Sequence, residues 1–172
     1  MKSVPVINTH RCTLSAVIQS DIHILRQILD DPETQRFLPE LCEEFPTIDS
    51  LQKFVVSFDK YLLQDDGILW GIRRDSVFIG FIAMMDIKTN PTLFYAMYPD
   101  YRNKGYMKEC LIKMIDYVYG ISLCDTLMTE VLCDNIISQE ILLSIGFRQY
   151  MKDRSKVYLR HANDINNSIW TN

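Results

Sequence analysis

The chain has 172 residues, of which 48% are apolar, so it can bury one substantial core without a second domain. Its formal charge of −4 at pH 7 argues against a non-specific nucleic-acid binder, because such proteins carry a basic surface. No stretch reaches the ~18 apolar residues of a membrane span, and the N-terminal segment is too short and interrupted for a signal peptide. We therefore expect one domain over residues 1–172 that binds neither nucleic acid nor membranes and suits cationic or amine partners.

Cysteine usage indicates a reducing, cytoplasmic setting. The five cysteines show no Cys-x-x-Cys spacing and have no histidine cluster beside them, so neither a disulfide framework nor a zinc site is predicted. The three histidines are widely spaced as well, and we expect no metal. The polar residues 162–172 are expected to fray.

The N-terminal part of the chain predicts a strand followed by helices. Residues 9–15 have the composition of a strand, and Ser20 is placed to cap a helix that Asp31-Pro32 ends. Residues 33–38 predict a short helix, and residues 39–46 predict a loop.

A longer helix and a hairpin come next. The helix closes near Asp66-Gly67, and its apolar face consists of Leu51, Phe54, Val55, Phe58 and Leu62. Residues 68–72 and 77–87 flank a four-residue turn and predict a β-hairpin, in which Gly80 marks a bulge or a close approach of two backbones.

The segment from Tyr98 to Met107 has the features of an anion-binding turn. It joins an apolar strand at residues 93–98, which Pro99 stops, to an amphipathic helix that ends near Gly120. The buried face of that helix is predicted from residues at steps of three and four, namely Met107, Cys110, Leu111, Met114, Ile115 and Val118. A basic turn that opens into a helix directs unpaired backbone N–H groups and the positive end of the helix dipole at one point, so a pyrophosphate fits there.

A second segment repeats the order of strand, turn and helix. A strand at residues 126–132 leads through Asn135 into a short helix from Ser138, and strands at residues 147–151 and 156–159 complete the pattern. The elements together predict an α+β fold with a mixed, mostly antiparallel sheet of about six to seven strands flanked by helices.

These two segments resemble the core of the GNAT superfamily of acyl-CoA-dependent N-acyltransferases, and more closely its RimJ/RimL-like branch. The family's pyrophosphate motif, Arg/Gln-x-x-Gly-x-Gly/Ala, falls on Arg102, Gly105 and Met107, with Met107 in the place of a small residue. The resemblance is clear from about Trp70 to Phe147 and fainter over the N-terminal helices.

The family's second signature is an asparagine followed three residues later by Ser or Ala and eleven residues later by Gly-Phe. In this chain it falls on Asn135, Ser138, Gly146 and Phe147, with every spacing kept. The resemblance implies an acetyl-CoA-dependent N-acetyltransferase in which a primary amine, of a protein N-terminus or a small molecule, attacks the thioester directly in a ternary complex. The residues expected to bind acetyl-CoA are Met97, Tyr98, Arg102, Asn103, Lys104, Gly105, Tyr106, Met107, Asn135 and Ser138.

Protonation of the departing thiolate has one candidate side chain. Many members of the superfamily use a tyrosine seven residues after the asparagine, and Leu142 stands there in this chain. The RimJ/RimL-like branch commonly lacks that tyrosine, and by analogy its serine, here Ser138, takes the role. The alternative is that Ser138 caps the following helix, and Asn135 has the same two alternatives of orienting CoA or capping.

A general base must reach the amine directly or through one water. Glu130, on the strand beside the central one, is the first candidate, and Asp86 is the second. Glu43 or Glu44 are placed to attract a cationic acceptor, and a water relay without a dedicated residue is an equal alternative.

Two other interpretations stay open from the sequence. A non-catalytic acyl-CoA-binding module would keep the turn but lack the chemistry, whereas a different nucleotide binder is disfavoured because the chain has neither a P-loop nor a Gly-x-Gly-x-x-Gly fingerprint. Both a monomer and a homodimer are compatible with the sequence.

Overall fold

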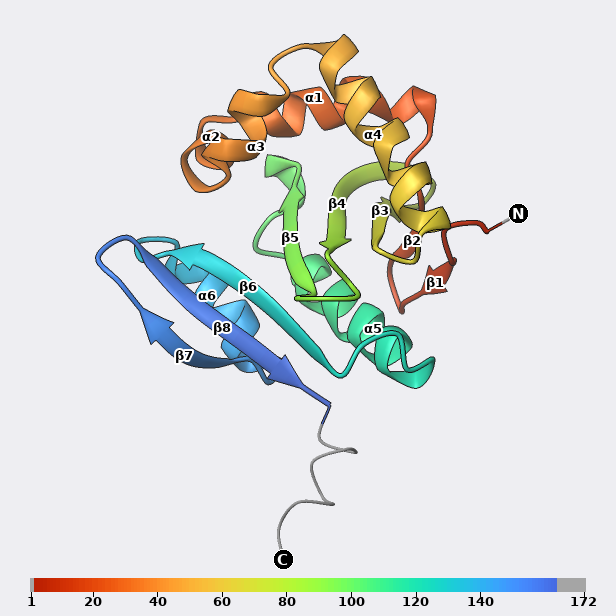
Figure 1. The fold of residues 1–172 in the computed structure, drawn as a ribbon. Coiled ribbons are helices and arrows are strands. Elements are labelled where there is room, and N and C mark those ends of the chain that lie inside the picture. Colours follow the sequence, from red (N-terminus) through yellow and green to blue (C-terminus); the bar gives the residue numbers. More distant parts are fainter. Residues whose placement is uncertain (1, 164–172) are drawn as a thin grey trace, which may run out of the picture.

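The computed structural model describes residues 2–163 and contains one mixed sheet with helices on both faces (Figure 1). The strands are β1 (Ile7–Asn8), β2 (Thr13–Ala16), β3 (Gly67–Arg74), β4 (Val77–Met85), β5 (Thr92–Met97), β6 (Thr126–Leu132), β7 (Arg148–Lys152) and β8 (Lys156–Ala162). Their order across the sheet is β1-β2-β3-β4-β5-β6-β8-β7. Neighbouring strands are antiparallel except β5 and β6, which are parallel. The expected fold class is confirmed, although within the described residues the sheet has eight strands, not six or seven.

Two helical layers cover the sheet. The helices are α1 (Ile22–Asp30), α2 (Pro32–Phe37), α3 (Pro39–Glu44), α4 (Ile48–Leu63), α5 (Tyr106–Gly120) and α6 (Ile136–Ser144). Apolar residues of α1 and α4 pack on one face of the sheet, and those of α5 and α6 pack on the other. The alternation of side chains along β3 and β4 supplies both layers, so Trp70 lies in the α5 layer and Leu69 in the α1 layer.

The additional strand is β1, which lies just before the segment expected to be the first strand. The N–H of Thr9 donates to the carbonyl of Cys12 at 2.8 Å, and the N–H of Cys12 donates to the Thr9 hydroxyl at 2.8 Å. These two bonds close a tight turn over residues 9–12, so the expected strand at residues 9–15 is shortened to β2, which pairs with β1 before the turn.

Three expected helix boundaries were wrong. Ser20 does not cap α1, because the carboxylate of Asp21 accepts the N–H of Ile18 at 2.8 Å and α1 begins after it. Residues 39–46 are mostly helical, since Pro39 occupies the first turn of α3, where a proline costs no hydrogen bond. In α6 the N-cap is Asn135, and the helix begins two residues before Ser138.

The C-terminal strand is longer than its composition indicates. Antiparallel pairing with β6 continues from Lys156 to Ala162, beyond the expected end at Leu159. Ala162 therefore belongs to β8, while the rest of the segment expected to fray lies, from residue 164 on, outside the described residues. Over residues 2–163, none of the helices has the length and apolar character needed to cross a bilayer.

Candidate active site

The site lies where β5 and β6 separate. Their pairing is limited to Thr92 opposite Met128, next to a hydrogen bond of 2.8 Å from the Thr129 hydroxyl to the carbonyl of Leu93. Beyond this point the two strands diverge, and β6 continues with β7 and β8 as a separate leaf of the sheet (Figure 1).

The backbone groups of β5 alternate between the β4 side and the gap. The N–H of Tyr98 donates to the carbonyl of Ile79 on the β4 side at 2.8 Å, whereas the carbonyl of Leu93 faces β6. Successive residues of a strand point their backbone groups to opposite sides, so Tyr95 and Met97 turn theirs toward the gap. The backbone groups of Met97 therefore face the gap, whereas the N–H of Tyr98 is bonded to Ile79 and is not a donor in the gap.

Two cavities meet at this gap. The first has a volume of about 350 Å³ and lies between β5, the turn before α5, α6 and α2. The second has a volume of about 650 Å³ and lies between α2, α3, α4 and the β5, β6 and β8 strands. The residues that line both cavities are Phe37, Leu38, Phe94, Thr129 and Glu130. A ligand bound in one cavity thus adjoins a ligand bound in the other.

The turn before α5 presents backbone donors to the first cavity. Asn103 and Gly105 both have positive φ, 58° and 79°, and no side chain caps the helix that follows. The first-turn N–H groups of α5 have no helical acceptor by construction, and Tyr106, Met107 and Lys108 line the cavity. A side chain at residue 105 would be strained at this φ and would place its Cβ 3.3 Å from Nη2 of Arg11.

Arg11 and Glu109 form a charged cluster that contacts the turn and does not line the first cavity. Arg11 donates from Nη1 to the carbonyl of Lys104 at 2.9 Å and forms an ion pair with Glu109 at 2.7 Å. Its guanidinium lies 4.5 Å from the ring centroid of Tyr106, whose hydroxyl accepts a hydrogen bond from Arg74. Burial acts to raise the pKa of Glu109, but hydrogen bonds from Thr9 and Arg11 dominate and lower it to about 2.

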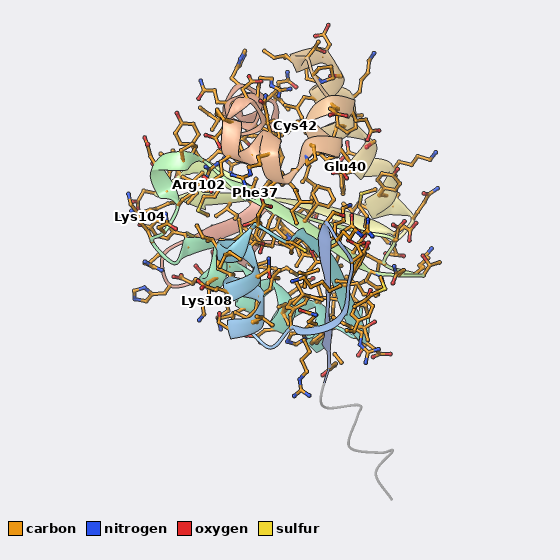
Figure 2. All side chains as sticks on the ribbon, turned by 90° about the vertical axis from the view of Figure 1, so that its left-hand side faces the viewer. Phe37, Glu40, Cys42, Arg102, Lys104 and Lys108 are labelled. Carbon is orange, nitrogen blue, oxygen red and sulfur yellow. The ribbon has the colours of Figure 1, made fainter. Side chains whose placement is uncertain are left out.

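The side chain of Arg102 lines the first cavity and is bound by other groups of the protein. Its Nε donates to the carbonyl of Met97 at 3.0 Å, and its two Nη atoms bind Glu33 at 2.6 Å and Asp31 at 2.7 Å. Figure 2 shows Arg102 beside Phe37 of α2, with Lys104 farther out on the turn. Because two carboxylates already neutralise this guanidinium, Arg102 anchors the α1–α2 junction to the end of β5.

The lysines near the turn differ in their placement. Lys104 donates to the carbonyl of Asp100 at 2.7 Å and does not line either cavity. Lys108, in the first turn of α5, lines the first cavity and was not singled out by the sequence (Figure 2). Its position in the first turn of α5, directly after the glycine-containing turn, was the available signal.

Ser138 and Asn135 lie together on the opposite wall of the first cavity. The carboxamide oxygen of Asn135 accepts the N–H of Ser138 at 3.1 Å, so Asn135, not Ser138, caps α6. The Ser138 hydroxyl lies 2.7 Å from the hydroxyl of Tyr95 on β5. Sequence reasoning missed Tyr95; its place two residues before Met97 on the same side of β5 was the signal for it. Burial raises the pKa of Tyr95 to about 12.

The candidate bases are placed differently from one another. Glu130 is exposed at the junction of the two cavities and forms an ion pair with Lys156 of β8. Asp86 follows β4 and lines neither cavity. Glu44 lines the second cavity, whereas Glu43 does not. Over residues 2–163, no cluster of three or more histidine, cysteine, aspartate or glutamate side chains is arranged to hold a metal ion.

Comparisons with known proteins agree with this geometry. The family model "Acetyltransferase (GNAT) domain" matches residues 11–148. The Bacillus subtilis (strain 168) protein named "Uncharacterized N-acetyltransferase YoaA" is 25% identical over 165 residues, which cover 90% of this chain and 92% of that protein.

Two solved structures show the same fold at low identity. RimL, the ribosomal L7/L12 alpha-N-protein acetyltransferase in complex with coenzyme A, has a TM-score of 0.83 at 14% identity and covers 93% of this chain and 99% of its own. A chimera of the spermidine N-acetyltransferase SpeG from Vibrio cholerae and hSSAT has a TM-score of 0.72 at 14% identity. The match covers 88% of this chain and 95% of the chimera. The family model covers most of the chain. The chain thus belongs to the GNAT family of N-acetyltransferases, whose acyl donor is acetyl-CoA.

Proposed function

We propose that this N-acetyltransferase moves the acetyl group of acetyl-CoA to a primary amine by direct attack within a ternary complex. The observation that carries the proposal is the meeting of two cavities at the gap between β5 and β6. A donor in the first cavity and an amine in the second would meet at Glu130 and Thr129 without an intermediate carrier on the protein. Such an arrangement gains its rate from holding the two reactants in one orientation.

The first cavity fits the chemistry of acetyl-CoA. The uncapped N-terminus of α5 and the ammonium of Lys108 are donors for a pyrophosphate. Asn103, Gly105, Tyr106 and Met107 would contribute backbone to this site, while the Tyr106 side chain is buried against Arg11. The backbone of Tyr95 and the N–H of Met97 face the gap and suit the amides of a pantetheine arm, which pair as an extra strand would, while the carbonyl of Met97 accepts Nε of Arg102.

The protein's contribution to the chemistry is positioning and hydrogen bonding. Bound acetyl-CoA supplies an activated thioester. The N–H of Met97 is placed to donate to the oxygen that gains charge, as backbone donors do in other acyl transfers. The Ser138 hydroxyl donates to the departing sulfur, and Tyr95 holds that hydroxyl in place. Since the pKa of Tyr95 is about 12, Tyr95 stays protonated while it does so.

The attacking amine must lose a proton. Glu130, at the junction of the cavities, is the proposed acceptor of that proton, either directly or through a water. An α-amino group, with a pKa near ~7.7 to 8.0, is deprotonated more cheaply at neutral pH than a lysine side chain near ~10.4. Protein N-termini and small amines of similar basicity are therefore the proposed acceptors. A protein N-terminus is also the acceptor that the name of the RimL structure indicates for that protein.

Thermal unfolding with acetyl-CoA, beside ATP and NAD as controls, tests the donor site. Ligand at 100 times its dissociation constant is expected to add about 2.7 kcal/mol, which shifts the midpoint by a few degrees. Release of free CoA thiol on addition of an amine panel then tests transfer. Binding of acetyl-CoA without thiol release on any amine or peptide would support the alternative of a non-catalytic acyl-CoA-binding module.

A further inference from the structure

Lys156 lines the second cavity and brings a positive charge to it. It stands at the start of β8, where it pairs with Leu132, and its ammonium contacts two carboxylates on different elements. One is Glu40 of α3 at 3.3 Å, and the other is Glu130 of β6. The hydrogen bond that Lys156 donates to Glu130, together with the one it donates to Glu40, raises the pKa of Lys156. The Lys156 side chain thus remains charged and joins the helical wall to the strand wall.

The remainder of this cavity is largely aromatic. Five rings line it, belonging to Phe37, Phe45, Phe54, Tyr61 and Phe94. Lys53 of α4 lines the same cavity but takes part in no ion pair among the described residues. Glu40 lies on α3, on the same side of the molecule as Phe37 (Figure 2). An amine entering the cavity therefore meets apolar walls, two carboxylates that already hold a cation, Glu40 and Glu130, and the carboxylate of Glu44, which forms no ion pair among the described residues.

We propose that Lys156 determines the charge of the amines that the second cavity accepts: its ammonium occupies Glu40 and Glu130, so the cavity takes an amine on an apolar body in preference to a diamine. The inference rests on the proposed function, because it assigns the second cavity to the acceptor. An apolar amine needs one neutral nitrogen at the junction and buries its body against the rings. A diamine brings a second cation, and Lys156 competes with that cation for Glu40 and Glu130.

The energetic scale of this effect is modest. The side chains of Lys156, Glu40 and Glu130 are 24%, 73% and 52% exposed, so water screens the ion pairs. Exposed pairs contribute up to about 1 kcal/mol, which corresponds to a factor of about five in an equilibrium constant. Lys156 therefore biases the choice between amines and does not exclude diamines absolutely.

The test compares Lys156→Met, which keeps the apolar stem, with the wild type. Calorimetry in the presence of CoA measures the affinities of 1,4-diaminobutane and 2-phenylethylamine. We expect the wild type to prefer 2-phenylethylamine, and Lys156→Met to shift the affinity ratio toward the diamine by about fivefold at low salt. Lys156→Arg keeps the charge and is expected to retain the wild-type ratio. Tetrapeptides that begin with phenylalanine or lysine repeat the comparison for a peptide acceptor. A shift with the small amines alone, or with the peptides alone, shows which of the two kinds of acceptor the cavity binds.

Two further variants make the result decisive. Lys152→Met removes a positive charge from the same hairpin outside both cavities, and we expect no shift. Lys53→Met removes a charge from the cavity that is not paired with a carboxylate among the described residues. A shift in Lys53→Met as large as that in Lys156→Met would overturn the proposal. An unchanged affinity ratio in Lys156→Met, or the absence of amine binding to the wild type, would overturn it too. Turnover is measured separately. A shifted ratio without release of CoA thiol would leave the inference standing and reject the proposed function.

Discussion

The hydroxyl oxygens of Tyr95 and Ser138 lie 2.7 Å apart, one on the central strand β5 and the other in the first turn of α6. The two residues come from opposite walls of the first cavity. With Asn135 as the cap of α6, the Ser138 hydroxyl has no capping role and is available to Tyr95 and to a ligand. The pair fixes the position of a hydroxyl donor where the strands separate.

Tyr95→Phe is expected to lower kcat about tenfold while leaving the affinity for acetyl-CoA near that of the wild type, because it removes the partner that orients Ser138. Ser138→Ala should lower kcat at least as much. The double variant should be little worse than Ser138→Ala alone, since the two side chains act as one unit. Steady-state kinetics measure all three, and additive losses would show that the residues act independently.

The pH profile offers a separate check on Tyr95. Burial raises the pKa of Tyr95 to about 12, so its hydroxyl stays protonated through pH 10, where an ordinary tyrosine is half ionised. Between pH 8 and about 10, we expect kcat to depend on pH in the same way in the wild type and in Tyr95→Phe, because Tyr95 does not ionise in this range. A fall with a midpoint near about 10 that disappears in Tyr95→Phe would contradict the assignment.

The ion pair of Arg11 and Glu109 predicts a dependence of stability on pH. The pKa of Glu109 is lowered from 4.5 to about 2 in the folded protein, so its contribution is fully present above the unfolded value and is lost as pH falls from 4.5 through about 2. Glu109→Gln should lower the free energy of unfolding by about 1 kcal/mol at pH 7 and by much less near about pH 2.

Urea unfolding at both pH values measures this difference. Asp116→Asn is the matched control on the same helix, because its ion pair with Lys113 is long, at 3.7 Å, and exposed. It should change the free energy of unfolding by less than about 0.5 kcal/mol. An equal loss for Glu109→Gln at both pH values would exclude the electrostatic explanation.

The placement of Arg102 and Lys108 predicts opposite phenotypes. Arg102→Met should destabilise the protein by about 1 to 3 kcal/mol, because it leaves Asp31 without its cation and opens the junction with α2. Lys108→Met should leave stability unchanged but weaken CoA binding and reduce its dependence on salt. Calorimetric titrations of CoA at several salt concentrations separate the two. If Arg102→Met reduced the salt dependence of CoA binding more than Lys108→Met does, the result would mean that Arg102 contacts the pyrophosphate.

Gly80 and Gly120 form a matched pair for the packing of the sheet. A Cβ at Gly80 would lie 2.7 Å from the carbonyl oxygen of Ala96, and that contact is backbone of the central strand. Gly80→Ala should therefore destabilise the protein by about 1 to 3 kcal/mol. Gly120→Ala meets nothing within 4 Å and should be neutral or stabilising by up to about 1 kcal/mol. Thermal unfolding compares them, and equal midpoints would refute the close contact of β4 and β5.

Much of the framework could be read from local sequence. The turn at residues 98–107 and the periodic face of α5 depend on residues close together in the chain, and so does the segment around Asn135. Gly80 correctly indicated a close approach of backbones, for the same local reason. The boundaries that failed were those where a side chain closed a turn, as Thr9 does between β1 and β2.

The sequence by itself determined the fold class and the strand-turn-helix order around residues 98–107, because these follow from periodicity and turn chemistry, and the resemblance of two motifs indicated the family to which the chain belongs. Only the tertiary structure decided what the side chains at the site do. Arg102 turns inward because Asp31 and Glu33, some 70 residues away, meet it there. Tyr95 reaches Ser138, and Lys156 reaches Glu40, for the same reason. Contacts between distant elements are set by strand register and helix packing, which no local pattern encodes.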